Sequence, residues 1–315
     1  IELRESVTVL RGNPDESVGT VLRGAVVVSV AEDYRVRAIH ARFRGRMRIW
    51  WNKGSPHQAI REVKRTLFER NWILLPQGKH THILKAGVHR YEFEELLPGD
   101  LPETVSVEYG SVHYQVQATV ERPLLHHNLA TEREVRVERH PYPMPLDWLD
   151  VCQVSDVWQN RVSYAMSVPT RAVGSGDVLP VRVEWQPERE DTRVRGVIFT
   201  LVEHVQYRPN EWAVQRDQRC VAQHSEKLGD ANGCGGTGDW SRTFFFRLPE
   251  SDYRHPRSRV QCDCRTPWIR VKHRLRVHVV FEDGIGAAKV YGIIPIVVLP
   301  QSPRSLAADP PGYDN

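Results

Sequence analysis

The chain has 315 residues and a formal net charge of +4, from 43 lysine and arginine residues against 39 aspartate and glutamate residues. A charge this mild argues against a dedicated nucleic-acid-binding protein, which usually carries a strongly basic domain. The longest apolar run, Tyr291–Pro300, is ten residues long and contains a proline, so no membrane span is predicted. The length is sufficient for two domains, each with a core of its own.

Short segments of alternating apolar and polar residues, separated by turn residues, fill the first half of the chain. Such alternation is typical of strands buried on one face, and no segment keeps the helical period of 3.6 residues. The expected strands are Ala25–Val30, Val36–Ile49, Val63–Leu75, the stretch around Tyr91 and Phe93, and Gly110–Val120. Between the last two lies Leu97–Pro102, whose two prolines predict a turn-rich corner outside the sheet.

The second half of the chain repeats the pattern of the first. Three pairs of segments match at offsets of 157, 158 and 159 residues: Gly19–Leu22 with Gly176–Leu179, Val36–Ile39 with Val194–Val197, and Val112–Val120 with Val271–Val279. Matches in the same order at nearly constant spacing indicate two β-sandwiches of one topology. His140–Pro145 holds three prolines in six residues and is typical of a stiff domain boundary. We therefore predict a first domain over residues 1–140, a proline-rich linker over 141–147 and a second domain over 148–300.

Residues 301–315 differ in composition from the rest of the chain. They contain three prolines and one large aliphatic residue, which is too little apolar surface to offset the entropy of ordering, so we predict a disordered tail. Within this tail Pro310, Pro311 and Tyr313 match the PPxY motif bound by WW domains. A pre-stiffened polyproline segment binds an aromatic groove at low entropic cost, and the tyrosine fills a neighbouring pocket. The alternative is a proline-rich tail with no ligand role.

Two strands carry cations at every second position. The first basic stripe comprises Arg42, Arg44, Arg46 and Arg48, and the second basic stripe comprises Arg270, Lys272, Arg274 and Arg276. Alternating cations are most often a solvated sheet face. The alternative is a docking surface for acidic peptide segments or anionic lipid headgroups.

The sequence predicts no catalytic centre, metal site or cofactor. The five cysteines do not form a disulfide framework and indicate a reducing, cytosolic compartment. The candidate zinc ligands fit no common spacing; they are Cys220, His224, Cys234, Cys262 and Cys264. Gly233–Gly238 matches GxGxxG, but it lacks the preceding strand and following helix of a dinucleotide site. His126, His127 and His140 lie beside loops and prolines and are expected at the surface.

These segments together resemble the alpha-arrestins, the arrestin-related trafficking adaptors, in a fungal form. The likeness to the arrestin N-domain rests on Gly19–Gly24, Gly45, Gly87–Phe93, Leu97–Pro102 and Val112–Pro123. The likeness to the arrestin C-domain rests on Pro187, Val197, Leu201–Glu203 and Ile269–Leu275, and a PPxY tail is a further family feature. The charged polar core that latches visual and beta-arrestins has no clear match in this sequence.

The resemblance implies an all-β fold, with two tandem arrestin-like antiparallel β-sandwiches and a disordered C-terminal tail. It implies a non-enzymatic adaptor that recognises cytosolic tails of plasma-membrane transporters or receptors. The tail would bring a HECT-type ubiquitin ligase through its WW domains, so that the cargo is ubiquitinated and internalised. An anionic membrane surface is a further expected partner, nucleic acid is not, and the expected location is cytoplasmic, peripheral at the plasma membrane and endosomes. An arrestin-like scaffold for signalling or endosomal sorting, without ligase recruitment, is the alternative.

Overall fold

A computed structural model describes the protein at residues 1–51, 61–123, 126–188, 192–228, 239–252, 260–283 and 286–308. The chain divides into two compact units, Ile1–Pro143 and Met144–Asn315. Both consist almost entirely of strands, which confirms the predicted all-β fold of tandem antiparallel sandwiches. Each unit is described separately below.

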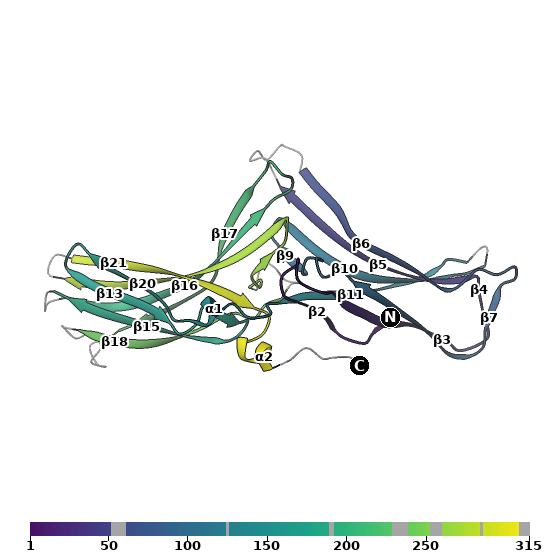
Figure 1. Ribbon diagram of the computed structural model, residues 1–315, viewed down its shortest axis with the longest axis horizontal. Coiled ribbons are helices and arrows are strands. Elements are labelled where there is room, and N and C mark those ends of the chain that lie inside the picture. Colours follow the sequence, from purple (N-terminus) through teal and green to yellow (C-terminus); the bar gives the residue numbers. More distant parts are fainter. Residues whose placement is uncertain are drawn as a thin grey trace. The chain divides into compact units, whose positions relative to one another are not determined.

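The first unit contains two main sheets (Figure 1). Its strands are β1 (Glu2–Leu3), β2 (Val7–Arg11), β3 (Thr20–Val30), β4 (Tyr34–Val36), β5 (Ala38–Trp51), β6 (Arg61–Leu75), β7 (His82–Leu84), β8 (Gly87–Leu97), β9 (Val105–Val107), β10 (Gly110–Glu121) and β11 (Leu129–His140). One sheet has the order β1-β3-β8 and the other β2-β11-β10-β5-β6, with β9 added beside β10. The ladders are antiparallel except for β2 with β11, which is parallel.

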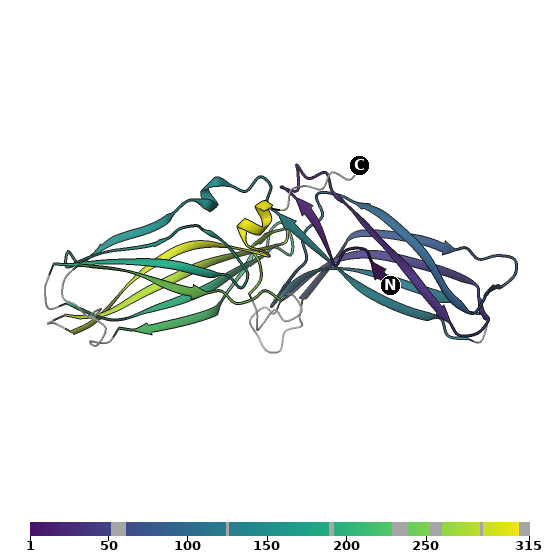
Figure 2. The same cartoon turned by 90° about the horizontal axis from the view of Figure 1, so that it is seen from below.

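The second unit repeats this plan with two short helices added. Its elements are α1 (Leu146–Leu149), β12 (Cys152–Trp158), β13 (Val162–Val168), β14 (Ala172–Gly174), β15 (Val178–Pro187), β16 (Arg193–Tyr207), β17 (Gln215–Lys227), β18 (Trp240–Arg247), β19 (Cys264–Arg265), β20 (Ile269–Asp283), β21 (Gly286–Leu299) and α2 (Pro303–Ala308). The sheets have the orders β12-β13-β15-β18 and β14-β21-β20-β16-β17, with β19 beside β20 (Figures 1 and 2).

Strand order explains the internal repeat in the sequence. Strands β2, β11, β10, β5 and β6 occupy the same places in the first unit as β14, β21, β20, β16 and β17 in the second, and the β2–β11 and β14–β21 pairs are both parallel. The matched stretches Val112–Val120 and Val271–Val279 lie in the corresponding strands β10 and β20. Their spacing is kept because each stretch fills the same position in its own sandwich.

Each core is built from the inward-facing half of the alternation. In the first unit Phe43 and Tyr114 are fully buried, and their rings stack with centroids 5.9 Å apart. Gly45 lies opposite Tyr114 across the β5–β10 ladder, and a Cβ atom there would come within 2.4 Å of the tyrosine ring. In the second unit the rings of Trp185 and Phe281 pack in a tilted arrangement, with centroids 5.0 Å apart. Packing of this density makes the interior sensitive to changes of single side-chain atoms.

The predicted corner at Leu97–Pro102 is held by side chains from other strands. The guanidinium of Arg139, at the end of β11, donates hydrogen bonds to the carbonyl oxygens of Gly99 and Leu101, each at 2.7 Å. The hydroxyl of Tyr114 donates to the carbonyl oxygen of Pro102 at 2.6 Å. A Cβ atom at Gly99 would lie 1.8 Å from the carbonyl oxygen of Ser17, so this position requires glycine. The corner is therefore a fixed part of the first unit.

We expect Tyr114→Phe to lower the free energy of unfolding by about 1–3 kcal/mol, because it leaves the buried Pro102 carbonyl without its donor. Urea unfolding followed by circular dichroism measures this change. Tyr91→Phe is the matched control, since Tyr91 is only half-buried and its hydroxyl has no protein partner among the described residues. The control should change stability by no more than about 0.5 kcal/mol. Equal changes in the two variants would contradict a specific role for the buried hydroxyl.

The structure differs from the sequence-based expectations at three places. Part of the expected extended linker forms helix α1, and Pro303–Ala308 of the expected disordered tail forms helix α2. Helix α2 is stabilised because Leu306 packs against a small apolar cluster of the second unit, a contact that composition alone does not indicate. The expectation of a surface position was wrong for His140, which is buried with Nε2 3.0 Å from Glu138 Oε2. His126 and His127 are exposed as expected.

Candidate docking surfaces and a buried charge cluster

The first basic stripe lies on the outward face of β5. Its arginines alternate along the strand with the buried residues Ala41, Phe43, Gly45, Met47 and Ile49. Carboxylates of the neighbouring strand β6 neutralise much of it. Arg42 and Arg44 each bind one oxygen of Glu69, at 2.7 and 2.8 Å, and Arg48 binds Glu62. This face is therefore largely an internal ion-pair network.

The second basic stripe lies on the outward face of β20, opposite the buried residues Val271, His273, Leu275 and Val277. Within the described part of the chain, none of Arg270, Lys272, Arg274 and Arg276 has a carboxylate partner. The two stripes thus look alike in sequence but differ in their surroundings.

Neighbouring strands explain why the second basic stripe is not neutralised. Residues directly opposite each other across a ladder point to the same face. The positions opposite the stripe on β16 and β21 are Gln206, His204, Val202, Thr200, Pro295 and Ile293, and the next row on β17 holds Arg216, Gln218, Cys220 and Gln223. None of these positions carries a carboxylate, and Arg216 adds another cation.

Burial, with a smaller contribution from neighbouring cations, lowers two side-chain pKa values on this face. Burial lowers the pKa of Lys272, repulsion by Arg270 lowers it further, and Asp263 opposes the effect only in part. Burial also lowers the pKa of His204, and Arg274 and Arg276 add to that shift. The cations that add to these shifts produce a positive local field, which attracts anionic groups.

The predicted WW-domain ligand, Pro310, Pro311 and Tyr313, lies outside the described residues. The segment that joins this motif to the second unit, helix α2, is among the described residues. Helix α2 ends at Ala308, and Leu306 of that helix packs against a cluster formed by Ala172, Val297 and Leu299. The Oγ atom of Ser302 accepts a hydrogen bond from the backbone N–H of Ser305 at 3.2 Å, which stabilises the first turn. The segment leading to the motif is therefore attached to the second unit as far as α2.

A buried charge cluster joins β16, β17 and β20 on the inward face of their sheet, and the sequence analysis did not identify it. Glu203 accepts a two-pronged ion pair from Arg219, with Nε–Oε1 at 2.7 Å and Nη2–Oε2 at 3.1 Å. His273 Nδ1 lies 2.6 Å from Asp263 Oδ1, and its Nε2 lies 3.5 Å from Glu203 Oε2. The backbone N–H groups of Gln261 and Val298 donate to Glu203 and Asp263 at 3.0 and 2.9 Å. The cluster anchors the segment before β20 to the sheet.

Charges in this cluster support one another. Burial opposes protonation of His273, but Asp263 and Glu203 outweigh it and raise the pKa of His273 to about 9. Burial favours the neutral form of Glu203, but the ion pair with His273 and the hydrogen bonds from Arg219 outweigh it and lower the pKa of that carboxyl. Because the side chains of Glu203 and His273 are 1% and 0% exposed, no substrate can reach them. The cluster therefore has a structural role. In the sequence it is indicated by titratable residues, Glu203 and His273, at inward-facing strand positions.

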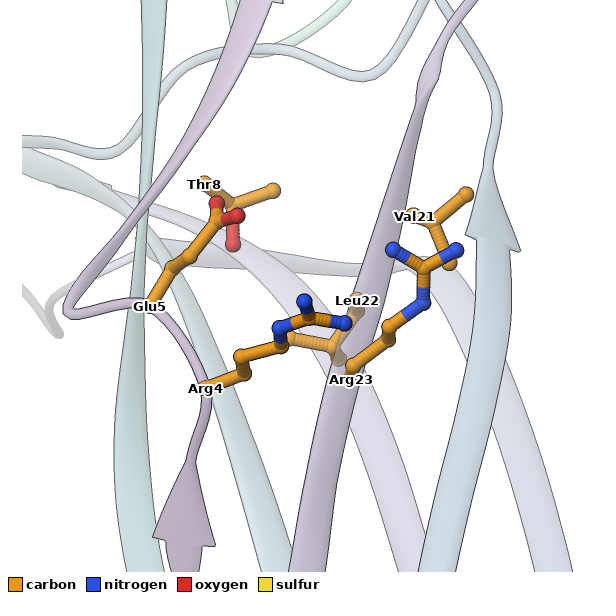
Figure 3. A pocket seen from close by; sticks show the side chains of 6 residues that line it. All are labelled: Arg4, Glu5, Thr8, Val21, Leu22 and Arg23. Atoms are coloured by element: carbon orange, nitrogen blue, oxygen red, sulfur yellow. The ribbon is translucent and has the colours of Figure 1, made fainter. Parts of the chain in front are cut away.

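One small hollow in the first unit is too small for a small-molecule substrate. A hollow of about 10 Å³, room for about one water molecule, lies among Arg4, Glu5, Thr8, Val21, Leu22 and Arg23 (Figure 3). Ligand pockets are typically about 300–1,000 Å³. No group of three metal-ligating side chains occurs among the described residues, and none of their helices is long and apolar enough to cross a bilayer. Cys152, Cys220, Cys262 and Cys264 form no disulfide within the described part of the chain, whereas Cys234 and the Gly233–Gly238 segment lie outside the described residues.

Comparison with known proteins identifies both units. Residues 7–140 match the family described as "Arrestin (or S-antigen), N-terminal domain", and residues 158–303 match "Arrestin (or S-antigen), C-terminal domain". An arrestin domain-containing protein of Schizosaccharomyces pombe is 26% identical over 95% of this chain and 50% of its own length. The HECT-type ubiquitin ligase-interacting protein creD of Emericella nidulans is 26% identical over 90% of this chain and 49% of its own length. Protein ROD1 of Saccharomyces cerevisiae is 22% identical over 70% of this chain and 33% of its own length.

The chain therefore spans about half, or less, of the curated relatives it matches. The two domain matches follow one another in the order of an arrestin and together cover most of the chain. They agree with the strand order of the two sandwiches and with the alpha-arrestin resemblance of the sequence. The chain belongs to the arrestin family, and its relatives named above are fungal.

Proposed function

We propose that this chain is a non-enzymatic adaptor that links membrane-protein cargo to a HECT-type ubiquitin ligase and so promotes ubiquitination and endocytosis of the cargo. The observation that carries the proposal is the PPGY sequence, Pro310–Tyr313, which follows shortly after a pair of arrestin domains. The relative from Emericella nidulans, which aligns with 90% of this chain, is named as a protein that interacts with a HECT-type ubiquitin ligase. This name supports the same partner here. The contact on the ligase would be its WW domains, since these bind PPxY segments.

The second basic stripe is the part of the body that best suits cargo or membrane binding. Its four cations have no carboxylate partner among the described residues, so an acidic cytosolic segment or an anionic lipid headgroup can form charge-assisted hydrogen bonds without displacing an existing pair. The first basic stripe would first have to give up Glu69 and Glu62. Such contacts fit a cytoplasmic protein that works at the inner surface of the plasma membrane and at endosomes.

Tyr313→Ala is expected to abolish capture of the protein by isolated WW domains in a pulldown, because it removes the side chain that fills the tyrosine pocket. The melting temperature should stay unchanged. Tyr142→Ala, at another exposed tyrosine, is the control and should be captured normally. Capture of Tyr313→Ala at the wild-type level would refute the assignment of the tail.

A scaffold for signalling or endosomal sorting without ligase recruitment predicts a different outcome for the tail. Deleting residues 301–315 would then leave every partner of the full chain bound. For the adaptor, the same deletion should remove the ligase and leave the cargo bound. Proximity labelling in cells with and without residues 301–315 separates the two functions.

A further inference from the structure

Helix α1 and Val151, which follows it two residues later, expose apolar side chains although the helix is held by hydrogen bonds. Leu146, Leu149 and Val151 are 78%, 44% and 67% exposed. The carbonyl oxygen of Trp148, between them, accepts hydrogen bonds from the backbone N–H of Arg171 at 2.9 Å and from Thr170 Oγ1 at 2.7 Å. We call Leu146, Leu149 and Val151 the α1 face. Since its backbone is fixed, the α1 face is a preformed apolar surface in contact with solvent.

The tail begins next to this surface. Trp148 of α1 and Leu306 of α2 pack against the same three-residue cluster, Ala172, Val297 and Leu299. Figures 1 and 2 both draw α1 and α2 next to each other at one end of the second unit. A Cβ atom at Gly174 of β14 would lie 2.6 Å from the backbone nitrogen of Ser302, so the chain leaves the sheet in close contact with β14. Helix α2 is thus seated beside α1.

The remaining length of chain limits where a bound partner can sit. Tyr313 follows Ala308, the last residue of α2, by five residues. Five residues reach at most about 18 Å even when fully extended. A WW domain that holds Pro310, Pro311 and Tyr313 therefore stays within this distance of α2. At such a distance the effective concentration of the domain near α1 is high.

We propose that the α1 face is a second docking surface for the WW domain that the tail captures. This proposal rests on the adaptor function proposed above and adds to it a contact with the folded body. Weak binding of one PPxY segment would be strengthened by apolar contact with the α1 face, because the tail has already brought the domain close.

The test compares a single recombinant WW domain binding to the full chain and to a synthetic peptide of residues 301–315, by isothermal titration calorimetry. The full chain is expected to bind at least about tenfold more tightly than the peptide. The double variant Leu146→Ser with Leu149→Ser should fall to the affinity of the peptide. Trp212→Ser is the matched control, because Trp212 is a 92% exposed apolar side chain elsewhere on the second unit, and it should bind like the wild type.

Two results would overturn the docking surface: equal affinities of full chain and peptide, or wild-type affinity in the double variant. Thermal melts of all variants establish that the changed positions, which are exposed, leave the fold intact. A peptide that fails to bind the WW domain at all would overturn the ligase-recruiting function, and the docking surface with it. A peptide that binds normally while the double variant has no effect would overturn the α1 face alone.

Discussion

Replacing His273 with leucine is expected to lower the free energy of unfolding by about 3–5 kcal/mol at pH 7. The imidazolium lies between Asp263 and Glu203, and its side chain is fully buried. Without it, the partners that remain among the described residues are the Val298 N–H group for Asp263, and Arg219 and the Gln261 N–H group for Glu203. Removing one partner leaves the desolvation cost of the remaining charges in place, which is why the expected loss is large.

The pH dependence of stability distinguishes this loss from a simple packing defect. The pKa of His273 is about 9 in the folded protein against an ordinary 6.5, so its stabilising contribution is complete below pH 6.5 and disappears as pH rises through 9. Glu203, with its lowered pKa, contributes in the opposite sense and loses its contribution only as pH falls through the acidic range. The difference in stability between wild type and His273→Leu should therefore shrink between pH 6.5 and 9.

Urea unfolding at a series of pH values measures this difference. His278→Leu is the control on the same strand, because burial and the cations Lys289 and Arg276 lower the pKa of His278, so no stabilising charge is removed. The control should not reproduce the loss at pH 7. A His273→Leu variant whose deficit is the same at pH 6.5 and at pH 9.5 would show that His273 contributes by packing and not by charge.

The second large effect concerns the two basic stripes. Changing all four residues of the second basic stripe to glutamine is expected to weaken binding to vesicles containing phosphatidylserine by roughly 10³-fold. Each cation near an anionic surface is worth about 1 kcal/mol, and a factor of ten in affinity corresponds to about 1.4 kcal/mol. Vesicle sedimentation at low and at physiological salt measures the effect, which salt should reduce in the wild type.

The first basic stripe provides a control with the same change in net charge. Changing Arg42, Arg44, Arg46 and Arg48 to glutamine also removes four positive charges. Three of these cations already bind Glu69 or Glu62, so their contribution to vesicle binding should be less than about tenfold. Equal losses in the two variants would mean that net charge, and not the unpaired face of the second unit, determines membrane binding.

Much of the fold could be predicted from the sequence because strand periodicity is a local property. Alternation placed Val112, Tyr114 and Val116 inward, and they are buried. The repeat at 157–159 residues indicated the shared topology. The inward position of His273 was visible too, but its partner Asp263 is ten residues away in a loop and Glu203 is on another strand, so only the fold brings the three together.

The candidate sites were harder to predict because they depend on contacts between residues that are distant in sequence. The sequence places four cations on one face of each stripe, but whether they are neutralised depends on the strand alongside. Glu69 lies 27 residues from Arg42 and reaches it only through the register of β5 with β6. Helix α2 was not predicted because the tail contains little apolar surface. Its one leucine, Leu306, packs against the cluster of Ala172, Val297 and Leu299, which is distant in sequence for Ala172 and cannot be recognised from composition.

The two units share a strand order although their outward-facing side chains differ, so the residues that define the fold are distinct from the residues available for binding. Backbone ladders and inward side chains define the sandwich, and they place no demand on which residues point to solvent. In the first unit Glu69 and Glu62 of β6 bind arginines of the first basic stripe, whereas the positions opposite the second basic stripe on β16 carry no acid. Exchanges at such outward positions therefore change the charge that a sandwich presents while its ladders and core stay the same.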